Sequence, residues 1–396
     1  MKSFSTASSI ASSTTRIISI DLLRGIIMVI MALDHVRDYF SIARFNPLDL
    51  TQTTPDYYFT RWITHLCAPN FVFLAGVGAF LMQYRGKPPK EMSMFLFTRG
   101  LWMIILEFTI VRFGWSFSLA DGFSVAQVIW VIGWAMILLS ALVRLPLKAI
   151  AVIGLSIILF HNALDGIKAE QFGNESWIWN FVHQPNIIKV SSNYSLFALY
   201  SLIPWVAVMA CGYCFGYFFT LPSHERLTSF LWIGSGMILT FLILRFANVY
   251  GDPHPWTVQK NGLYSFLSFM NVEKYPPSLL YLDVTIGIGI LLLALFEKAN
   301  GPLVDFFTIY GRVPLFYYVS HIYLVHFLAL IAAQLTLGRF DFMIGTPFNG
   351  FGKIPYGFEL PMVYLMWILA ILILYYPCRW FAGVKKRNKA VWLSYL

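Results

Sequence analysis

Long apolar runs, separated by short polar segments, dominate the chain. A helix needs about 20 mostly apolar residues to cross a bilayer, and ten segments have that character: 17–40, 62–84, 99–113, 123–143, 149–164, 196–220, 229–248, 279–296, 314–336 and 360–382. The third and the fifth are short, which leaves a tilted or re-entrant course open for them. The pattern therefore predicts an all-α fold, a polytopic transmembrane bundle of about ten helices.

The segments outside these spans are too short to form a second folded unit. Residues 1–15 are rich in Ser and Thr and are predicted to form a disordered cytoplasmic N-terminus. Residues 16–384 then form one transmembrane domain, and 385–396 form a basic cytoplasmic tail. The first apolar run is too long for the hydrophobic region of a signal peptide, and no small-residue cleavage site follows it. We therefore interpret it as a retained first span.

Composition indicates that lipid is the main solvent of this chain. Of its 396 residues, 58% are hydrophobic and only 12% are charged, whereas a soluble domain has roughly 25% charged residues. The lipid bilayer is therefore its expected partner. The net charge of +9 does not favour a nucleic-acid partner, because membrane proteins carry excess Lys and Arg in their cytoplasmic loops.

The distribution of basic residues predicts the orientation. More than half of the 28 Lys and Arg residues fall on the side of the N-terminus, in the shorter connections and the C-terminal tail. This bias predicts an integral protein of a bacterial cytoplasmic (inner) membrane with both termini cytoplasmic. The opposite segments, 41–61, 165–195, 249–278 and 337–359, are longer and contain Trp, Tyr, Asn and Pro. They form either plain interfacial loops or a docking surface for a polar substrate.

The first span carries most of the intramembrane charge. Ionisable residues inside a bilayer are costly, so each is a functional hypothesis. Arg24 and His35 are eleven residues apart, which places them on one helix face about 16 Å apart along the axis. Asp21 and Asp38 lie near the same face, three residues outside each of them. We predict that Arg24, His35 and Asp38 line one polar cavity, while Asp21 is best explained as an ion-pair partner of Arg24.

The residue types on this face suggest separate roles. Arg24, nearer the cytoplasmic end, suits an anion such as phosphate. His35, nearer the outer end, suits proton transfer, and Asp38 is placed to orient its ring. Asp34, adjacent to His35, is the third catalytic candidate.

Histidines in other spans add weaker candidates. His65 in the second span and His321 in the ninth are candidate substrate-binding residues. His321 and His326 are five residues apart, so they do not share one helix face. Because a metal site needs three or four converging ligands, no metal site is expected. Arg312, which precedes the ninth span, is a second candidate for the anion-binding cavity.

Five stretches carry a family resemblance: RIISIDLLRG at 16–25, MALDH at 31–35, APNFVFLAG at 68–76, KYPPSL at 274–279 and YGRVPLFYYVSH at 310–321. With them the chain resembles the heparan-alpha-glucosaminide N-acetyltransferase catalytic-domain family. The pairing of Arg24 with His35 is also similar to the arginine–histidine signature of the related acyltransferase 3 family. These stretches add Asn70 and Lys274 to the candidate substrate-binding residues.

The resemblance implies a transmembrane acyl transfer. The co-substrate would be acetyl-CoA or another acyl-CoA from the cytoplasm, with no permanently bound cofactor, and the acceptor a sugar or glycan on the far side. Arg24 and Arg312 would bind the CoA phosphates, and His35 would act as general base or transient acyl carrier. In the eukaryotic enzyme the position of His35 is an asparagine and a histidine in the following loop is catalytic. Loop 41–61 contains no histidine, so either His35 has taken over the role or the chemistry differs.

Two other classes of function stay open at this point. A transporter or permease for a small polar or glycan-derived solute would also place polar residues near the membrane midplane, although the sequence shows no inverted repeat. A non-catalytic membrane subunit is the third reading. The sequence also leaves open whether the chain forms a homo-oligomer.

Overall fold

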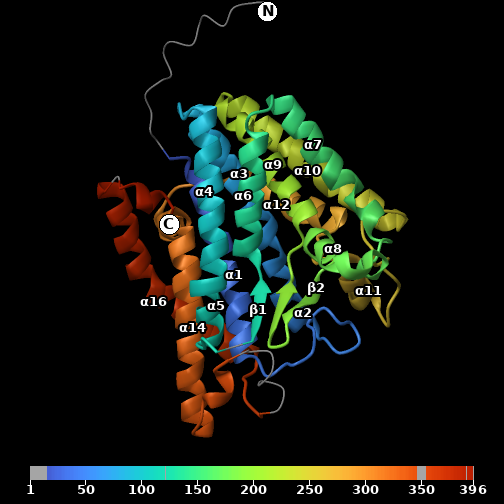
Figure 1. The fold of residues 1–396 in the computed structure, drawn as a ribbon, viewed down its shortest axis with the longest axis vertical. Coiled ribbons are helices and arrows are strands. Elements are labelled where there is room, and N and C mark those ends of the chain that lie inside the picture. The colour runs from blue at the N-terminus through green and yellow to red at the C-terminus, as the bar shows by residue number, and fades with distance from the viewer. Residues whose placement is uncertain (1–15, 121, 346–353, 389, 396) are drawn as a thin grey trace, which may run out of the picture.

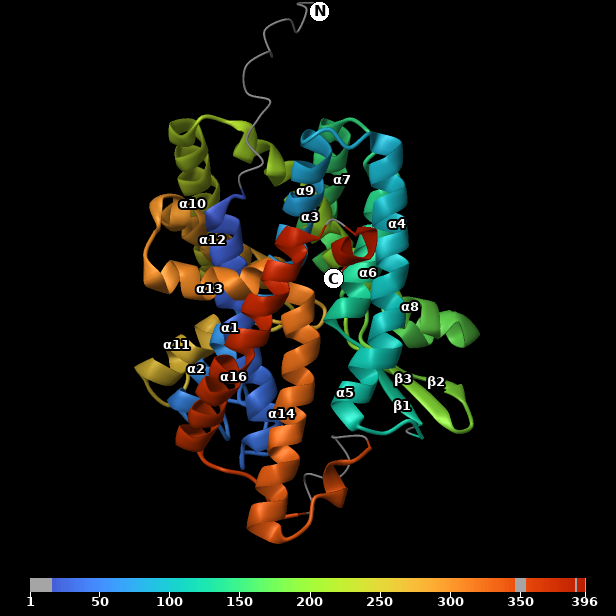
Figure 2. The ribbon, with the colours of Figure 1, turned by 90° about the vertical axis from the view of Figure 1, so that its left-hand side faces the viewer.

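The computed structural model describes residues 16–120, 122–345, 354–388 and 390–395. The predicted disorder of 1–15 lies outside these ranges. The described chain is a bundle of helices with one small sheet at its side (Figures 1 and 2). The predicted all-α transmembrane class is confirmed, because most described residues are helical and the strands are few and short.

Eight helical segments of the described chain are long and apolar enough to cross a bilayer. They are Pro55–Tyr84, made of α2 (Pro55–Trp62), η1 (Ile63–Leu66) and α3 (Cys67–Tyr84); Pro89–Ser116, made of α4 (Pro89–Leu106), the π-helical turn η2 (Glu107–Val111) and α5 (Arg112–Ser116); Leu147–Leu164, made of α7 (Leu147–Phe160) and η3 (His161–Leu164); Leu202–Thr220, made of α9 (Leu202–Phe215) and η5 (Gly216–Thr220); α10 (Ser223–Ala247); Leu279–Lys298, made of α12 (Leu279–Leu295) and η6 (Phe296–Lys298); α14 (Pro314–Leu337); and α16 (Leu360–Arg387).

Two further helices complete the ten predicted spans. Helix α1 (Ile18–Phe40) has 23 residues, enough to cross a bilayer, but it carries several charged side chains. Helix α6 (Val128–Leu142) is entirely apolar apart from one serine and has 15 residues. Helix α1 can carry charged side chains within the bundle because its buried face packs against α13, α14, α16 and α3 rather than against lipid.

Several predicted boundaries were wrong, and three of them show the limits of the apolar pattern. The run 123–143 begins as strand β1 (Phe123–Ala126), and the run 196–220 begins inside strand β3 (Tyr194–Ala198). A short apolar run does not distinguish a strand from a buried helix. The third span, predicted as 99–113, lies in the C-terminal part of the 28-residue helical segment Pro89–Ser116; Lys90, Glu91 and Arg99 interrupt the apolar pattern before it.

The sheet lies beside the lower half of the bundle in Figure 2. Its strand order is β1–β3–β2, with β2 at Asn186–Ser191. Strand β3 pairs in parallel with β1 and antiparallel with β2. Shorter elements connect the spans: η4 (Ala169–Glu175), α8 (Ser176–Val182), α11 (Gly262–Met270), α13 (Pro302–Arg312), η7 (Asp341–Met343) and η9 (Val391–Ser394). Helix α13 lies across the bundle in Figure 2 and ends next to α1.

Glycines allow α1 and α13 to pack backbone against backbone. A Cβ atom on Gly25 would lie 1.9 Å from the carbonyl oxygen of Phe307, and one on Gly311 would lie 1.8 Å from that of Asp21. Small residues that permit such close approach are typical of membrane helix pairs. This contact places Arg312 beside Asp21. Similar glycine pairs join α3 to α9 and α4 to α6: Gly76 with Gly212, and Gly100 with Gly133.

The loop charges predict that the two ends of the bundle face opposite sides of the membrane. The start of α4 lies at the top of Figure 1, whereas α11 lies in the lower half. We expect reporter fusions at residue 88 and at residue 265 to give signals from opposite sides of the membrane. Activity of a periplasmic reporter and fluorescence of a cytoplasmic reporter at each position would measure this. Signals from the same side at both positions would contradict the topology.

Candidate active site

Two cavities of similar size lie inside the bundle. One has a volume of about 530 Å³ and is lined by the first half of α1 together with α3, α4, α6, α14 and the end of α16. The other has a volume of about 510 Å³ and is lined by the second half of α1, the sheet and the segment before α12. We call the first the basic cavity, because Arg and Lys side chains line it, and the second the histidine cavity, because His35 lines it.

The basic cavity is strongly cationic. Its lining contains one carboxylate, Asp21, and six cations among the described residues: Arg16, Arg24, Arg85, Arg99, Arg312 and Lys385. Arg16 Nε lies 2.8 Å from the Asp21 carboxylate, whereas the nearest atoms of Arg24 and Arg312 lie 3.9 and 4.0 Å from it. A single carboxylate cannot neutralise this set, so the cavity is suited to an anion that carries several charges.

The histidine cavity contains a network of ion pairs. Arg37 contacts Asp34 at 2.9 Å and Asp38 at 2.7 Å, and Arg61 forms a short ion pair with Asp34. Arg61 also donates to the Thr64 hydroxyl at 3.1 Å. Partly buried charges of this kind persist only when they are paired. The network fixes the end of α1 against the start of the second span.

His35 forms a hydrogen bond to a second histidine. Its Nδ1 lies 2.6 Å from Nε2 of His321, and the two rings are nearly parallel, with centroids 4.9 Å apart. His321 is fully buried, and its Nδ1 lies 3.1 Å from the carbonyl oxygen of Tyr317. The indole ring of Trp115 packs edge-on against His35 at 4.9 Å.

This chain of contacts determines the tautomers of both neutral rings. A backbone carbonyl only accepts, so Nδ1 of His321 carries the hydrogen and its Nε2 accepts. Nδ1 of His35 must then donate to it, which leaves the lone pair on Nε2 of His35. Because His35 lines the cavity, this nitrogen is available to take a proton from a bound molecule.

A π-helical turn positions Trp115 beside His35. Glu107 begins the turn η2, and its carboxylate accepts a hydrogen bond of 2.9 Å from the backbone N–H of Trp130 in the first turn of α6. Free N–H groups at a helix start need such partners, and π-turns often occur at functional sites. The Tyr39 hydroxyl then donates to the carbonyl oxygen of Trp115 at 2.6 Å.

The segment before α12 supplies a further cation to the histidine cavity. Lys274 lines the cavity and is only 7% exposed. Burial raises the pKa of the neighbouring Tyr275 phenol, but the Lys274 ammonium and the Arg61 guanidinium outweigh burial and lower that pKa. Asp252 holds this segment in place, since it accepts hydrogen bonds of 2.8 Å from the Glu273 N–H and the Ser278 hydroxyl.

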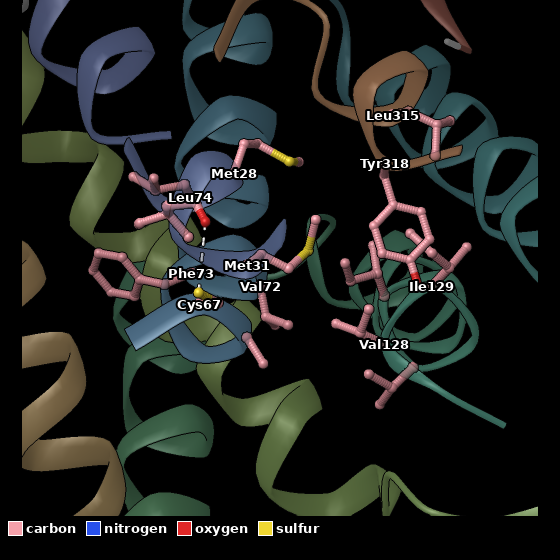
Figure 3. Close-up of a cluster of buried hydrophobic side chains, with 14 of the residues drawn as sticks. Met28, Met31, Cys67, Val72, Phe73, Leu74, Val128, Ile129, Leu315 and Tyr318 are labelled. Atoms are coloured by element: carbon pink, nitrogen blue, oxygen red, sulfur yellow. Dashed lines mark hydrogen bonds between the residues drawn. The ribbon is translucent and has the colours of Figure 1, made fainter. Parts of the chain in front are cut away.

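The two cavities meet inside the bundle. Three side chains line both of them: Phe71, Val128 and Tyr318. Met28 lines the basic cavity and Met31 the histidine cavity. Figure 3 shows these two methionines pointing from α1 toward Tyr318 and Val128. A molecule that reaches from one cavity into the other must pass between these side chains.

The structure divides the predicted polar stripe into two groups. Arg24 and Arg312 line the basic cavity, and His35, Asp34 and Asp38 line the histidine cavity. The expectation of one shared cavity was therefore too simple, because apolar side chains lie between the two groups. The orientation of the His35 ring also differs from the prediction: His321 holds it, whereas Asp38 pairs with Arg37.

Of the other predicted substrate-binding residues, Lys274 lines the histidine cavity and His321 lies behind it. His65 is fully buried and lines neither cavity. Asn70 also lies outside both; its amide donates to the carbonyl oxygens of Leu66 at 2.8 Å and Thr285 at 3.0 Å. In the described part of the chain, no group of His, Cys, Asp or Glu side chains could hold a metal ion.

Sequence reasoning missed Arg37, Arg61 and Trp115. The ion pair of Arg37 could have been predicted from the sequence, because Arg37 follows Asp34 by three residues and therefore shares its helix face. Arg61 lies just before the second predicted span and resembled an ordinary interfacial arginine. Nothing in the sequence linked Trp115 to His35, since the contact depends on how α5 packs.

Comparison with known proteins adds a family assignment. Residues 16–245, more than half of the chain, match the model of the family described as heparan-alpha-glucosaminide N-acetyltransferase, catalytic. The matched range contains Arg24, His35 and the ion-pair network of Asp34, Arg37 and Arg61. A search of curated proteins found no match.

Proposed function

The chain belongs to the heparan-alpha-glucosaminide N-acetyltransferase catalytic-domain family, and from this premise we propose that it transfers an acyl group across a membrane. The donor is a cytoplasmic acyl-CoA, and the acceptor is an amine or hydroxyl of a sugar or glycan on the opposite side. The main observation in support of the proposal is that a basic cavity adjoins a second cavity lined by His35, with side chains common to both linings.

The basic cavity fits the charged end of coenzyme A. Its arginines offer planar, permanently charged donors that suit phosphate groups, and Arg24 and Arg312 are only loosely paired with Asp21. The pantetheine arm is uncharged, so it tolerates an apolar passage that phosphates do not. Arg24 and His35 lie about 16 Å apart by helical rise, a separation suited to a long ligand with phosphates at one end and a thioester at the other.

The histidine cavity supplies the chemistry. Nε2 of His35 takes a proton from the acceptor amine or hydroxyl as its nitrogen or oxygen attacks the thioester carbonyl. The C–S bond breaks, and the CoA thiolate receives that proton back from Nε2. While His35 is cationic, its Nδ1–H donates to His321, which spreads the charge into a second ring. The acyl group ends on the acceptor, and free CoA returns to the basic cavity.

The orientation follows from the donor. Acyl-CoA is a cytoplasmic molecule, so the basic cavity opens toward the cytoplasm, together with the N-terminal end of α1 and the C-terminal end of α16. Both termini are then cytoplasmic, which agrees with the loop charges. A bacterial cytoplasmic membrane is the location that this arrangement supports.

Replacing Arg24 by alanine is expected to raise KM for acetyl-CoA about tenfold and to leave kcat nearly unchanged, because a charge-assisted contact to phosphate acts on the bound substrate and transition state alike. Steady-state kinetics over a range of acetyl-CoA concentrations would measure this. Arg379→Ala removes an exposed arginine of α16 that lines neither cavity and should leave both constants unchanged. A fall in kcat with constant KM would contradict the phosphate role of Arg24.

The proposal itself is tested in sealed vesicles that contain the purified protein. With acetyl-CoA on the side of the basic cavity and glucosamine as acceptor probe on the other, free CoA thiol should appear on the donor side and acetylated sugar on the acceptor side. Saturable binding of acetyl-CoA to the detergent-solubilised protein is a second expected result. Absence of binding, together with movement of sugar unchanged across the membrane, would favour a transporter.

A further inference from the structure

An apolar layer separates the two cavities. Phe71 of α3, Val128 of α6 and Tyr318 of α14 line both, and none of them is charged. On one side of this layer lie the six cations and one carboxylate of the basic cavity. On the other lie three cations, Arg37, Arg61 and Lys274, and the carboxylates of Asp34 and Asp38. Figure 3 shows Val128 and Tyr318 facing α1, with Leu315 and Ile129 beside them.

Both cavities reach the surface of the protein, at different ends. The lining of the basic cavity includes exposed residues near the start of α1 and the start of α4, among them Arg16 and Arg85. The lining of the histidine cavity includes Asp38, at the far end of α1, and Ile187 of β2, which is 57% exposed. Water can therefore enter the bundle from both ends, up to the same three side chains.

We propose that Phe71, Val128 and Tyr318 form a hydrophobic gate that prevents the two cavities from joining into an anion-selective pore. Narrow apolar constrictions stop conduction because water leaves them, and a charge without water or a partner is costly in such a place. The excess of cations on both sides would favour anions if the gate were open. The gate thus preserves the membrane potential in a protein that must let an acyl group through.

The gate lies in the passage that the proposed acyl transfer would use. One part of the inference, the effect of bound coenzyme A, rests on the proposed function. The uncharged arm of a bound acyl-CoA would occupy the passage and take over the sealing role. Coenzyme A should therefore block any leak that opening of the gate creates. The seal of the empty protein, in contrast, depends only on the three side chains.

Ion leakage from proteoliposomes tests the gate. The double variant Phe71→Ala/Val128→Ala removes much of the gate, and Val152→Ala/Phe160→Ala makes the same two changes on the exposed face of α7. Vesicles loaded with potassium chloride should lose chloride about tenfold faster with the gate variant than with the wild type, as expected for a widened constriction. Chloride should leave faster than potassium, and the α7 variant should match the wild type.

The outcomes separate the gate from the proposed function. A folded gate variant that is as tight as the wild type, or a wild type that leaks equally, overturns the gate. If the double variant does not elute as a folded protein, Val128→Ala alone replaces it, because the smaller side chain widens the constriction with less loss of packing; it too should leak. A leak that coenzyme A fails to reduce supports the gate and counts against acyl-CoA as the ligand of the basic cavity.

Discussion

Replacing His35 by alanine is expected to lower kcat by about 10²–10⁴-fold, the usual contribution of a general base. The reason is positional: the hydrogen bond from Nδ1 to His321 leaves Nε2 as the proton acceptor of a cavity-lining ring. The binding of acetyl-CoA should change little, since the phosphate contacts lie in the other cavity. Turnover measured at saturating acetyl-CoA, beside the dissociation constant of acetyl-CoA, separates the two effects.

The control for this variant is His224→Ala, which removes an exposed histidine near the start of α10 and should leave turnover unchanged. Elution of the His35 variant as a monodisperse species with a wild-type unfolding temperature would show that the fold is intact. Near-normal turnover of His35→Ala with every acceptor tested would refute the mechanism. It would also reopen the possibility that another group carries the chemistry in this member of the family.

The second large effect is expected from His321, which touches His35 and acts through it as a positioning residue. His321→Leu removes the acceptor of the His35 Nδ1–H at similar volume and should lower kcat roughly 10²-fold. This fall in kcat is smaller than the fall of about 10⁴-fold that follows loss of the orienting carboxylate in a catalytic triad. The reason is that a neutral imidazole stabilises a cationic partner less than a carboxylate does. KM for acetyl-CoA should stay close to the wild-type value, because His321 lines neither cavity.

A conservative variant distinguishes positioning from packing. His321→Gln places an amide oxygen near the position of Nε2 and should recover part of the rate that His321→Leu loses. The double variant of His35 and His321 should be no slower than His35→Ala alone, because residues that act as one unit are not additive. Equal losses for Leu and Gln, or additive losses in the double variant, would show that His321 acts only through packing.

Much of the fold was predictable because the bilayer imposes a simple rule. Ten apolar segments predicted ten helices, and all ten exist, including the highly charged α1. The strands were not predictable, since residues 123–126 and 194–198 are as apolar or aromatic as a buried helix. They pair with each other across some 70 residues of sequence, and periodicity within one segment does not report such contacts.

The site was predictable where it depends on one helix and not where it depends on packing. The spacing of Arg24 and His35 on α1 placed them in the right order along one face. The hydrogen-bond partner of His35 could not be predicted, because His321 lies on α14 and is brought next to α1 only by the packing of the two helices. The division into two cavities has the same origin, since Phe71, Val128 and Tyr318 come from three different helices.

The most direct test of the account is an experimental structure of the protein with coenzyme A bound. We expect the phosphates to contact Arg24 and Arg312 in the basic cavity, and the arm to pass between Phe71 and Tyr318. The thiol should then lie within reach of Nε2 of His35. Coenzyme A bound with its phosphates outside the basic cavity, or with its thiol directed away from His35, would contradict the account.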